Sequence, residues 1–155
     1  MTKYQFLTEL RALWRQAIFD KGSRCPCCDR WGKVYGRSIN TTMARSLVWL
    51  AHHSPNGEWV NVPQTAPRWL LKSNQLATMR WWDLIERHGT DDPTKKHSGL
   101  WRATPKGQDF ANNRIKVPKK VFTYDAEVME FGDEEVWIKD CIEFFDYRSV
   151  MESAT

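Results

Sequence analysis

The sequence has no long apolar run and few of the motifs that mark common enzyme classes. No segment reaches 18 consecutive apolar residues, so we expect no membrane-spanning helix. The N-terminus is amphipathic and lacks the apolar core of a secretory signal, which favours a cytoplasmic protein. A phosphate-binding glycine loop, an H-E-x-x-H pair and a paired-carboxylate motif are all missing. We therefore expect no enzymatic activity, and a Cys/His nucleophile pair assembled by the fold is the alternative left open.

Cysteine is scarce, and its placement does not suit a disulfide framework. Three of the four cysteines, Cys25, Cys27 and Cys28, lie within four residues, which fits a reducing compartment. Cys25 and Cys28 have the C-x-x-C spacing with which two thiolates hold zinc from a tight turn. A closed zinc site needs four ligands, and no second pair with this spacing follows. A zinc site and an incomplete knuckle both stay open, with redox chemistry the weakest alternative. The side chains that would complete a zinc site are Cys27, His52, His53, His97 and Cys141.

Three of those completing side chains have simpler interpretations. His52 and His53 end a predicted helix, where charged histidines favour the helix C-terminus, so we interpret them as caps rather than ligands. Cys141 falls near the apolar face of a second predicted helix, and we expect it to be a buried small hydrophobe.

Aromatic and basic residues are abundant instead. The 155 residues include nine Trp, with 41% apolar and 27% charged residues, which is the composition of a globular domain. Residues 1–124 hold 21 Lys and Arg against nine Asp and Glu, a balance of +12. Residues 125–155 hold two basic against ten acidic residues, a balance of −8. This asymmetry predicts a basic body that binds a polyanion and an acidic end that does not; a solvated surface of both signs is the alternative.

The first half of the chain predicts helices in the order of a helix-turn-helix. Apolar residues spaced by three and four predict a helix over 2–20, which packs either within the monomer or on a second copy. Asn40 is an N-cap for a helix that ends near His53, and an alternating strand follows over 58–62. Two short helices come next, over 68–72 and 75–82.

The stretch from Ser73 to Phe110 then predicts a β-hairpin. A strand begins at Leu84, a charged loop spans 88–96, and a second strand returns over 99–104. Thr104 is an N-cap with Pro at the first helical position. The runs Asp83-Leu84-Ile85 and Ala103-Thr104-Pro105-Lys106-Gly107 resemble the wing segment of many bacterial winged-helix regulators, with a MarR-like wing pattern. This resemblance implies a winged helix-turn-helix.

From Arg114 onward the chain predicts a small β-meander and a closing helix over 139–145. We therefore expect the α+β class, with a winged helix-turn-helix core, an N-terminal helix, a small cysteine turn and a C-terminal meander plus helix. The expected organisation is an N-terminal helix over 1–22, a cysteine turn or hairpin over 23–38, a winged helix-turn-helix over 39–116, and a C-terminal meander with an acidic helix and tail over 117–155.

Several motifs together resemble a family of small phage and prophage proteins of unassigned function. The shared features are a C-P-x-C turn, a helix of the Met43-Ala44 type, a W-x-L-I-E segment over 82–86, a G-x-W-R-x-T-x-K-G run over 99–107, a V-P-K segment over 117–119 and the ending Phe145-Asp146-Tyr147. The resemblance covers roughly residues 25–150. It implies a phage origin, and hence the host cytoplasm, and it carries over no catalytic residue and no ligand.

A winged helix-turn-helix assigns roles to its polar side chains. Asn and Gln pair with adenine, and Arg with guanine, so the predicted second short helix would read bases, while basic residues of the wing would contact phosphates. The interpretation that these are structural residues stays open, and Met79, Trp81 and Trp82 are expected in the core. The predicted DNA-binding residues are Asn74, Gln75, Thr78, Arg80, Arg87, Lys95, Lys96 and His97.

The sequence therefore predicts a DNA-binding phage or prophage protein that acts as a transcriptional regulator or an accessory of DNA metabolism, as a monomer or a homodimer. The alternative is a protein-interaction module that binds a host protein through the winged domain or through the acidic region over 125–155.

Overall fold

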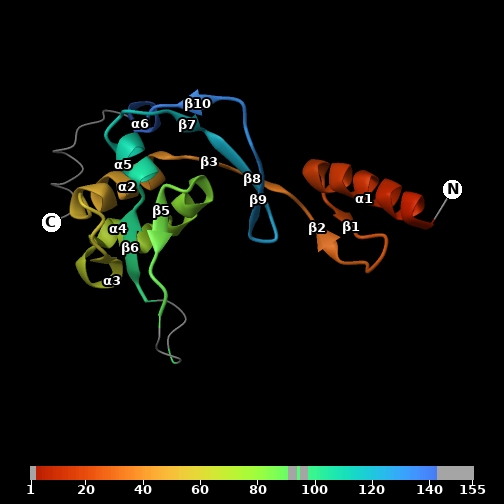
Figure 1. The fold of residues 1–155 in the computed structure, drawn as a ribbon, viewed down its shortest axis with the longest axis horizontal. Helices are drawn as coiled ribbons and strands as arrows, with labels where there is room; N and C mark the ends of the chain where they lie inside the picture. Colours follow the sequence, from red (N-terminus) through yellow and green to blue (C-terminus); the bar gives the residue numbers. More distant parts are fainter. Residues whose placement is uncertain (1–2, 91–93, 95–97, 143–155) are drawn as a thin grey trace. The chain divides into compact units, whose positions relative to one another are not determined.

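The computed structural model describes residues 3–90, 94 and 98–142, which divide into two compact units. Unit 1 comprises residues 1–37 and 120–132, and unit 2 comprises residues 38–119 and 133–155. Both combine helices with small antiparallel sheets, which confirms the α+β class (Figure 1). Residues 117–155, expected as one C-terminal segment, are shared between the two units. No described helix is long and apolar enough to cross a membrane.

Unit 1 contains one long helix, a short hairpin and most of a three-stranded sheet. The hairpin pairs β1 with β2, and the sheet has the order β3-β8-β9. The elements are α1 (Lys3–Asp20), β1 (Ser23–Arg24), β2 (Trp31–Gly32), β3 (Tyr35–Ser38), β8 (Lys120–Tyr124) and β9 (Glu127–Phe131). The predicted two- or three-stranded meander is present as the antiparallel pair β8–β9, and the third strand of this sheet, β3, comes from residues far earlier in the chain.

A close approach at Gly32 holds α1 against the strands of unit 1. A Cβ atom at Gly32 would lie 2.7 Å from the Trp14 ring and 3.1 Å from both Ile18 and Tyr124. Trp14 and Tyr124 pack edge to face with ring centroids 5.7 Å apart. The Val34 amide donates to the Ile18 carbonyl at 2.7 Å. The helix is thus fixed at its C-terminal half, where Ile18 is buried.

Unit 2 carries the remaining elements, and α2 is its central helix. α2 contacts α4, η1, β6, α5 and α6. The elements are α2 (Thr41–His53), β4 (Val60–Asn61), α3 (Val62–Thr65), α4 (Arg68–Ser73), the 3-10 helix η1 (Leu76–Trp82), β5 (Ile85–Arg87), β6 (Leu100–Ala103), α5 (Pro105–Ala111), β7 (Val117–Pro118), β10 (Glu135–Val136) and α6 (Ile138–Cys141).

The two predicted N-caps of unit 2, Asn40 and Thr104, are confirmed. The Asn40 side chain accepts from the Met43 amide at 2.8 Å, which satisfies one of the free N–H groups at the start of α2. The Thr104 side chain does the same for the Gly107 amide at 3.0 Å, with Pro105 at the start of α5. Asn61 caps the short helix α3, which was not predicted because the alternating pattern over 58–62 indicated only a strand there.

The predicted helix over 75–82 is present as a 3-10 helix over Leu76–Trp82. Side chains three residues apart lie on one edge of a 3-10 helix. The buried residues of this helix are Leu76, Met79 and Trp82, which have that spacing. Met79 and Trp82 are therefore in the core as expected, whereas Trp81 is only half-buried.

The predicted hairpin is present as β5 and β6, which pair antiparallel with Ile85 opposite Ala103. β4 adds to the other edge of β6, and the sheet order is β4-β6-β5. The start of α5 packs on the backbone that enters β5, where a Cβ atom at Gly107 would lie 1.9 Å from the Leu84 carbonyl oxygen. Only glycine fits this contact.

The closing helix begins one residue earlier than predicted. α6 starts at Ile138, where the Trp137 amide donates to the Asp140 carboxylate at 3.2 Å. The described part ends at Ile142, so residues 143–145 of the predicted helix, and the Phe145-Asp146-Tyr147 ending, lie outside the described residues.

Candidate functional sites

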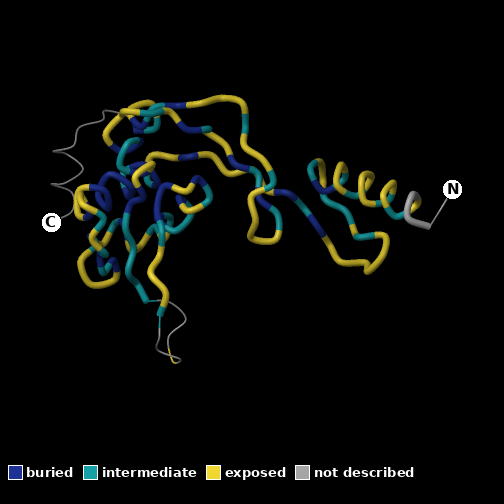
Figure 2. Tube along the Cα trace, viewed as in Figure 1, coloured by how far each residue is buried: buried dark blue, intermediate teal, exposed yellow. Residues whose placement is uncertain are grey.

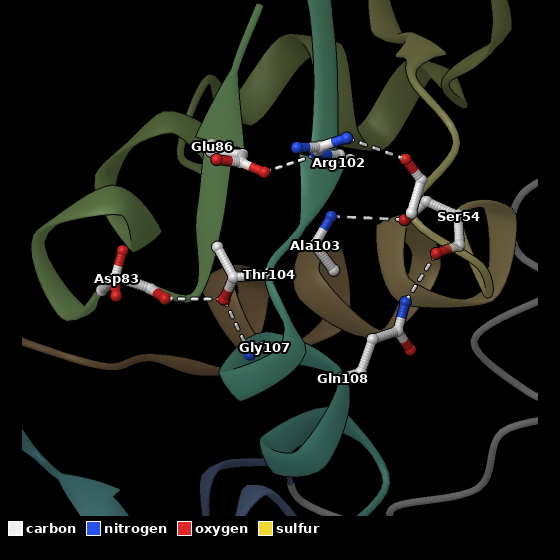
Figure 3. A network of polar contacts seen from close by, with 9 residues as sticks. Ser54, Asp83, Glu86, Arg102, Ala103, Thr104, Gly107 and Gln108 are labelled. Atoms are coloured by element: carbon white, nitrogen blue, oxygen red, sulfur yellow. Dashed lines mark hydrogen bonds and ion pairs between the residues drawn. The ribbon is translucent and has the colours of Figure 1, made fainter.

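A polar network fixes the β5–β6 hairpin to the helices of unit 2 (Figure 3). The buried Ser54 hydroxyl accepts from the Ala103 amide at 3.2 Å and donates to the Leu50 carbonyl at 2.8 Å. The Gln108 side-chain amide donates to the Ser54 carbonyl at 2.7 Å. The Thr104 hydroxyl donates to the Asp83 carbonyl at 2.7 Å, so α2, η1, β6 and α5 share one set of hydrogen bonds.

The outer part of the same network orients β6. The Arg102 guanidinium pairs with the Glu86 carboxylate across the β5–β6 register and donates to the Gly57 carbonyl at 3.2 Å (Figure 3). The guanidinium carbon also lies 4.1 Å from the centroid of the Trp59 ring. Arg102 is therefore a structural cation, and its charge is already matched by a carboxylate.

A cavity of about 450 Å³ lies between α3, α4, η1 and the β5–β6 hairpin. Its floor is apolar and includes Leu70, Leu76 and Trp101. Its polar lining includes Asn74, Arg80 and Arg87, all three of which are exposed. The full lining is Val62, Pro63, Leu70, Leu71, Asn74, Leu76, Ala77, Arg80, Arg87, Gly99 and Trp101.

The two arginines of this cavity are held on aromatic rings rather than by acids. The Arg80 guanidinium lies 4.8 Å from the Trp81 ring centroid, and that of Arg87 lies 5.5 Å from the Trp101 ring centroid. Within the described residues, neither arginine forms an ion pair with a carboxylate. Aromatic contacts position a guanidinium without neutralising it, so the cavity presents two cations suited to an anion.

The structure separates the predicted base-reading residues into two groups. Asn74 and Arg80 line the cavity, and Asn74 has a left-handed backbone with a φ of 53° where it ends α4. Gln75 and Thr78 are not among the lining residues: the Thr78 hydroxyl donates to the Gln75 carbonyl, and the Gln75 side-chain oxygen is buried. Of the predicted wing contacts, Arg87 lines the cavity, whereas Lys95, Lys96 and His97 lie outside the described residues.

A second basic cavity of about 660 Å³ was not predicted. It is lined by Thr41, Thr42, Arg45, Trp69, Lys72 and Ser73. The Arg45 guanidinium lies 5.5 Å from the Trp69 ring centroid. In the sequence, Arg45 occupies an ordinary polar position of a helix, and nothing local brings it to Trp69 on α4.

The cysteine turn of unit 1 has a defined geometry. The Asp29 amide donates to the Cys25 carbonyl at 2.8 Å, and the Cys25 amide donates to the Arg30 carbonyl at 2.7 Å. Asp29 closes the turn with a left-handed backbone, at a φ of 61°. Hydrogen bonds from the Cys27 and Cys28 backbone amides lower the pKa of the Cys25 thiol, and the neighbouring thiols add to this effect. The turn thus favours a thiolate at Cys25.

The candidate zinc ligands beyond this turn belong to unit 2 or lie outside the described residues, and one of them makes a different contact. His52, His53 and Cys141 belong to unit 2, and His97 lies outside the described residues. His53 Nδ1 lies 2.8 Å from the Trp49 carbonyl oxygen, and the two rings stack. Burial raises the pKa of the Cys141 thiol to about 11, with a smaller contribution from Asp140. Across residues 3–90 and 98–142, no group of three His, Cys, Asp or Glu side chains is arranged to hold a metal.

No protein-family model matches this sequence, and neither a curated protein nor a solved structure matches it significantly.

Proposed function

We propose that this chain binds double-stranded DNA through unit 2, as a transcriptional regulator or a DNA-metabolism accessory of a phage or prophage. The order of elements supports a winged helix-turn-helix: the helix α2, the strand β4, the short helices α4 and η1, and then the β5–β6 hairpin. The strand β5 of the hairpin contacts η1, and residues of α4, η1 and the hairpin line one cavity. The basic balance of residues 1–124 supports a polyanionic partner.

The observation that carries this proposal is the shared cavity of Asn74, Arg80 and Arg87. These side chains come from the end of α4, from η1 and from the hairpin, which are the elements that a winged helix-turn-helix applies to DNA. Arg80 and Arg87 supply charge for phosphates, and Asn74 supplies an amide that pairs with an adenine edge.

The short η1 limits how many bases the protein reads. Seven residues at about 2.0 Å each give roughly 14 Å of helix, and one edge of it is buried in unit 2. Phosphate contacts and DNA shape therefore contribute more than base contacts. We expect binding with modest sequence preference and strong dependence on salt.

The test measures binding of the full chain to duplexes from the promoter regions of its own source genome, at several salt concentrations. Arg80→Ala and Arg87→Ala are each expected to weaken binding and to lower the slope of log affinity against log salt by about 1. Arg114→Ala is the matched control, because Arg114 is exposed and pairs with Asp109 at 3.5 Å outside the cavity. Absence of salt-sensitive binding, or equal losses in all three variants, would overturn the proposal.

A second function is favoured by the acidic part of unit 2. Glu134, Glu135 and Asp140 line a cavity of about 490 Å³ between β10, α6 and the start of α2. Such a surface suits a basic segment of a host protein. A host protein that co-purifies with the chain and is lost from the Glu134→Lys, Glu135→Lys variant would support this alternative; retention of the partner would exclude this surface.

A further inference from the structure

Unit 1 contains half of a tetrahedral thiolate site. Structural zinc is held by four ligands, often as two C-x-x-C pairs, each presented by a tight turn. Cys25 and Cys28 form one such pair on the turn between β1 and β2, and the chain contains no second pair.

We propose that Cys25 and Cys28 of one chain and the same two cysteines of a second copy bind one zinc ion, which joins two chains through unit 1. The site takes Zn²⁺ in a shell of four thiolates, and the four thiols release their protons to solvent on binding.

The backbone of the turn is already arranged for this ligand. Zinc binds the thiolate form of cysteine. The left-handed conformation of Asp29, with the hydrogen bond from its amide to the Cys25 carbonyl at 2.8 Å, closes the turn that follows Cys28. Cys27 and Cys28 are exposed and Cys25 is half-buried, so the pair is accessible from solvent.

Unit 1 does not complete the shell by itself. All four histidines of the chain fall in unit 2. Two aspartates of unit 1 are engaged with arginines, since Arg24 pairs with Asp29 at 3.7 Å and Arg30 pairs with Asp125 at 3.0 Å. Among the described side chains, no three potential ligands are placed to hold a metal. The described residues of unit 1 therefore supply only part of a tetrahedral shell, which the same pair of a second chain completes.

A second copy fits because it supplies the same turn and covers apolar surface. Of the seven large apolar side chains that are exposed among the described residues, six lie in unit 1. Figure 2 shows largely exposed chain along α1 and along the turn between β1 and β2. A two-fold axis through the metal places the same surface on both sides, as in other symmetric dimers. The six side chains are Phe6, Leu13, Trp31, Tyr35, Val128 and Phe131.

The size of unit 1 points the same way. Unit 1 has only 50 residues, from 1–37 and 120–132, and three apolar side chains among its described residues are buried. Units of this size are commonly stabilised by a metal or by oligomerisation.

The test measures zinc content and mass in solution of the full chain purified under reducing conditions without chelator. We expect one zinc ion per two chains and the mass of a dimer, with cobalt substitution giving the absorption of a tetrahedral thiolate site. A strong chelator is expected to convert the dimer to monomers while unit 2 stays folded, as followed by tryptophan fluorescence and circular dichroism.

Cysteine variants identify the ligands. Cys25→Ser and Cys28→Ser are expected to lose both zinc and the dimer. Cys27→Ser is the matched control, because it removes a thiol from the same turn outside the C-x-x-C pair and is expected to retain both. The chelator experiment on the unmodified chain keeps the proposal testable where a variant misfolds.

Three results would overturn the proposal: one zinc ion per monomer, a Cys25–Cys28 disulfide without zinc under reducing purification, or loss of zinc in Cys27→Ser as complete as in Cys28→Ser. None of these results bears on DNA binding by Arg80 and Arg87, so the two proposals fail independently.

Discussion

The two units of this chain bury their apolar side chains to very different extents. Of the 26 buried apolar residues in the described part of the chain, unit 1 contributes three, Ile18, Val34 and Val121, and unit 2 contributes the rest. Six of the seven large apolar side chains that are exposed in that part lie in unit 1. Since buried apolar area is the main source of folding free energy, unit 2 has a core of its own, whereas unit 1 depends on other contacts.

We expect the largest effect on stability when a side chain in the core of unit 2 is truncated. Phe110 on α5 is fully buried, and Phe110→Ala should destabilise unit 2 by about 3–5 kcal/mol, through lost burial and the cavity left behind. Urea unfolding followed by tryptophan fluorescence measures this loss.

Leu13→Ala in α1 is the control for that experiment. Leu13 is 64% exposed, and its truncation should change the unfolding free energy of unit 2 by less than about 0.5 kcal/mol. Equal losses of unfolding free energy in the two variants would show that unit 1 and unit 2 unfold together. The difference in buried apolar residues would then not correspond to a difference in stability.

We expect smaller losses of stability when a single polar contact is removed from either unit. The buried Ser54 hydroxyl joins Leu50 to Ala103, so Ser54→Ala leaves the Ala103 amide without that acceptor and should cost about 1–3 kcal/mol. Arg30 and Asp125 form an exposed ion pair in unit 1, and Arg30→Gln should cost less than about 1 kcal/mol. The midpoints of thermal unfolding provide the measurement, and a larger loss from Arg30→Gln would contradict the comparison.

Local signals in the sequence predicted the N-caps and the hairpin of unit 2. Asn40 and Thr104 were recognised as caps because a cap depends only on a side chain and an amide three residues away. The hairpin followed from its turn residues and strand pattern. Asn74, Arg80 and Arg87, which were predicted to bind DNA, line one cavity, and their binding to DNA stays a prediction. The 3-10 form of η1 was missed, although the spacing of Leu76, Met79 and Trp82 contains that signal.

Unit 1 and the second basic cavity depend on distant pairings that leave no such signal. β3 pairs with the β8–β9 hairpin, which lies more than 80 residues later in the chain. No local pattern in Tyr35–Ser38 indicates with which strand it pairs. Likewise, the approach of Arg45 to Trp69 depends on how α2 packs against α4. The C-x-x-C spacing was visible, but the amides of Cys27 and Cys28 that favour a thiolate are a property of the folded turn.

We expect the smallest effect in the reactivity of two cysteines of the metal-free chain, Cys25 in unit 1 and Cys141 in unit 2. Backbone amides lower the pKa of the Cys25 thiol in unit 1, whereas burial raises the pKa of the Cys141 thiol in unit 2 to about 11. At neutral pH we therefore expect a larger thiolate fraction at Cys25 than at Cys141, and a ratio of their alkylation rates above one. The weaker nucleophilicity of a low-pKa thiolate offsets part of this difference.

Alkylation of the chelator-treated chain with iodoacetamide, followed by mass spectrometry of the two peptides, measures this ratio. As pH rises, the Cys25 rate should level off first, because that thiol is fully deprotonated at a lower pH, while the Cys141 rate should continue to rise toward pH 11. Alkylation in denaturant is the control, since unfolding removes both the amide contacts and the burial and should bring the two rates together. Equal rates in the folded chain would show that neither the turn of unit 1 nor the packing around α6 in unit 2 controls its thiol.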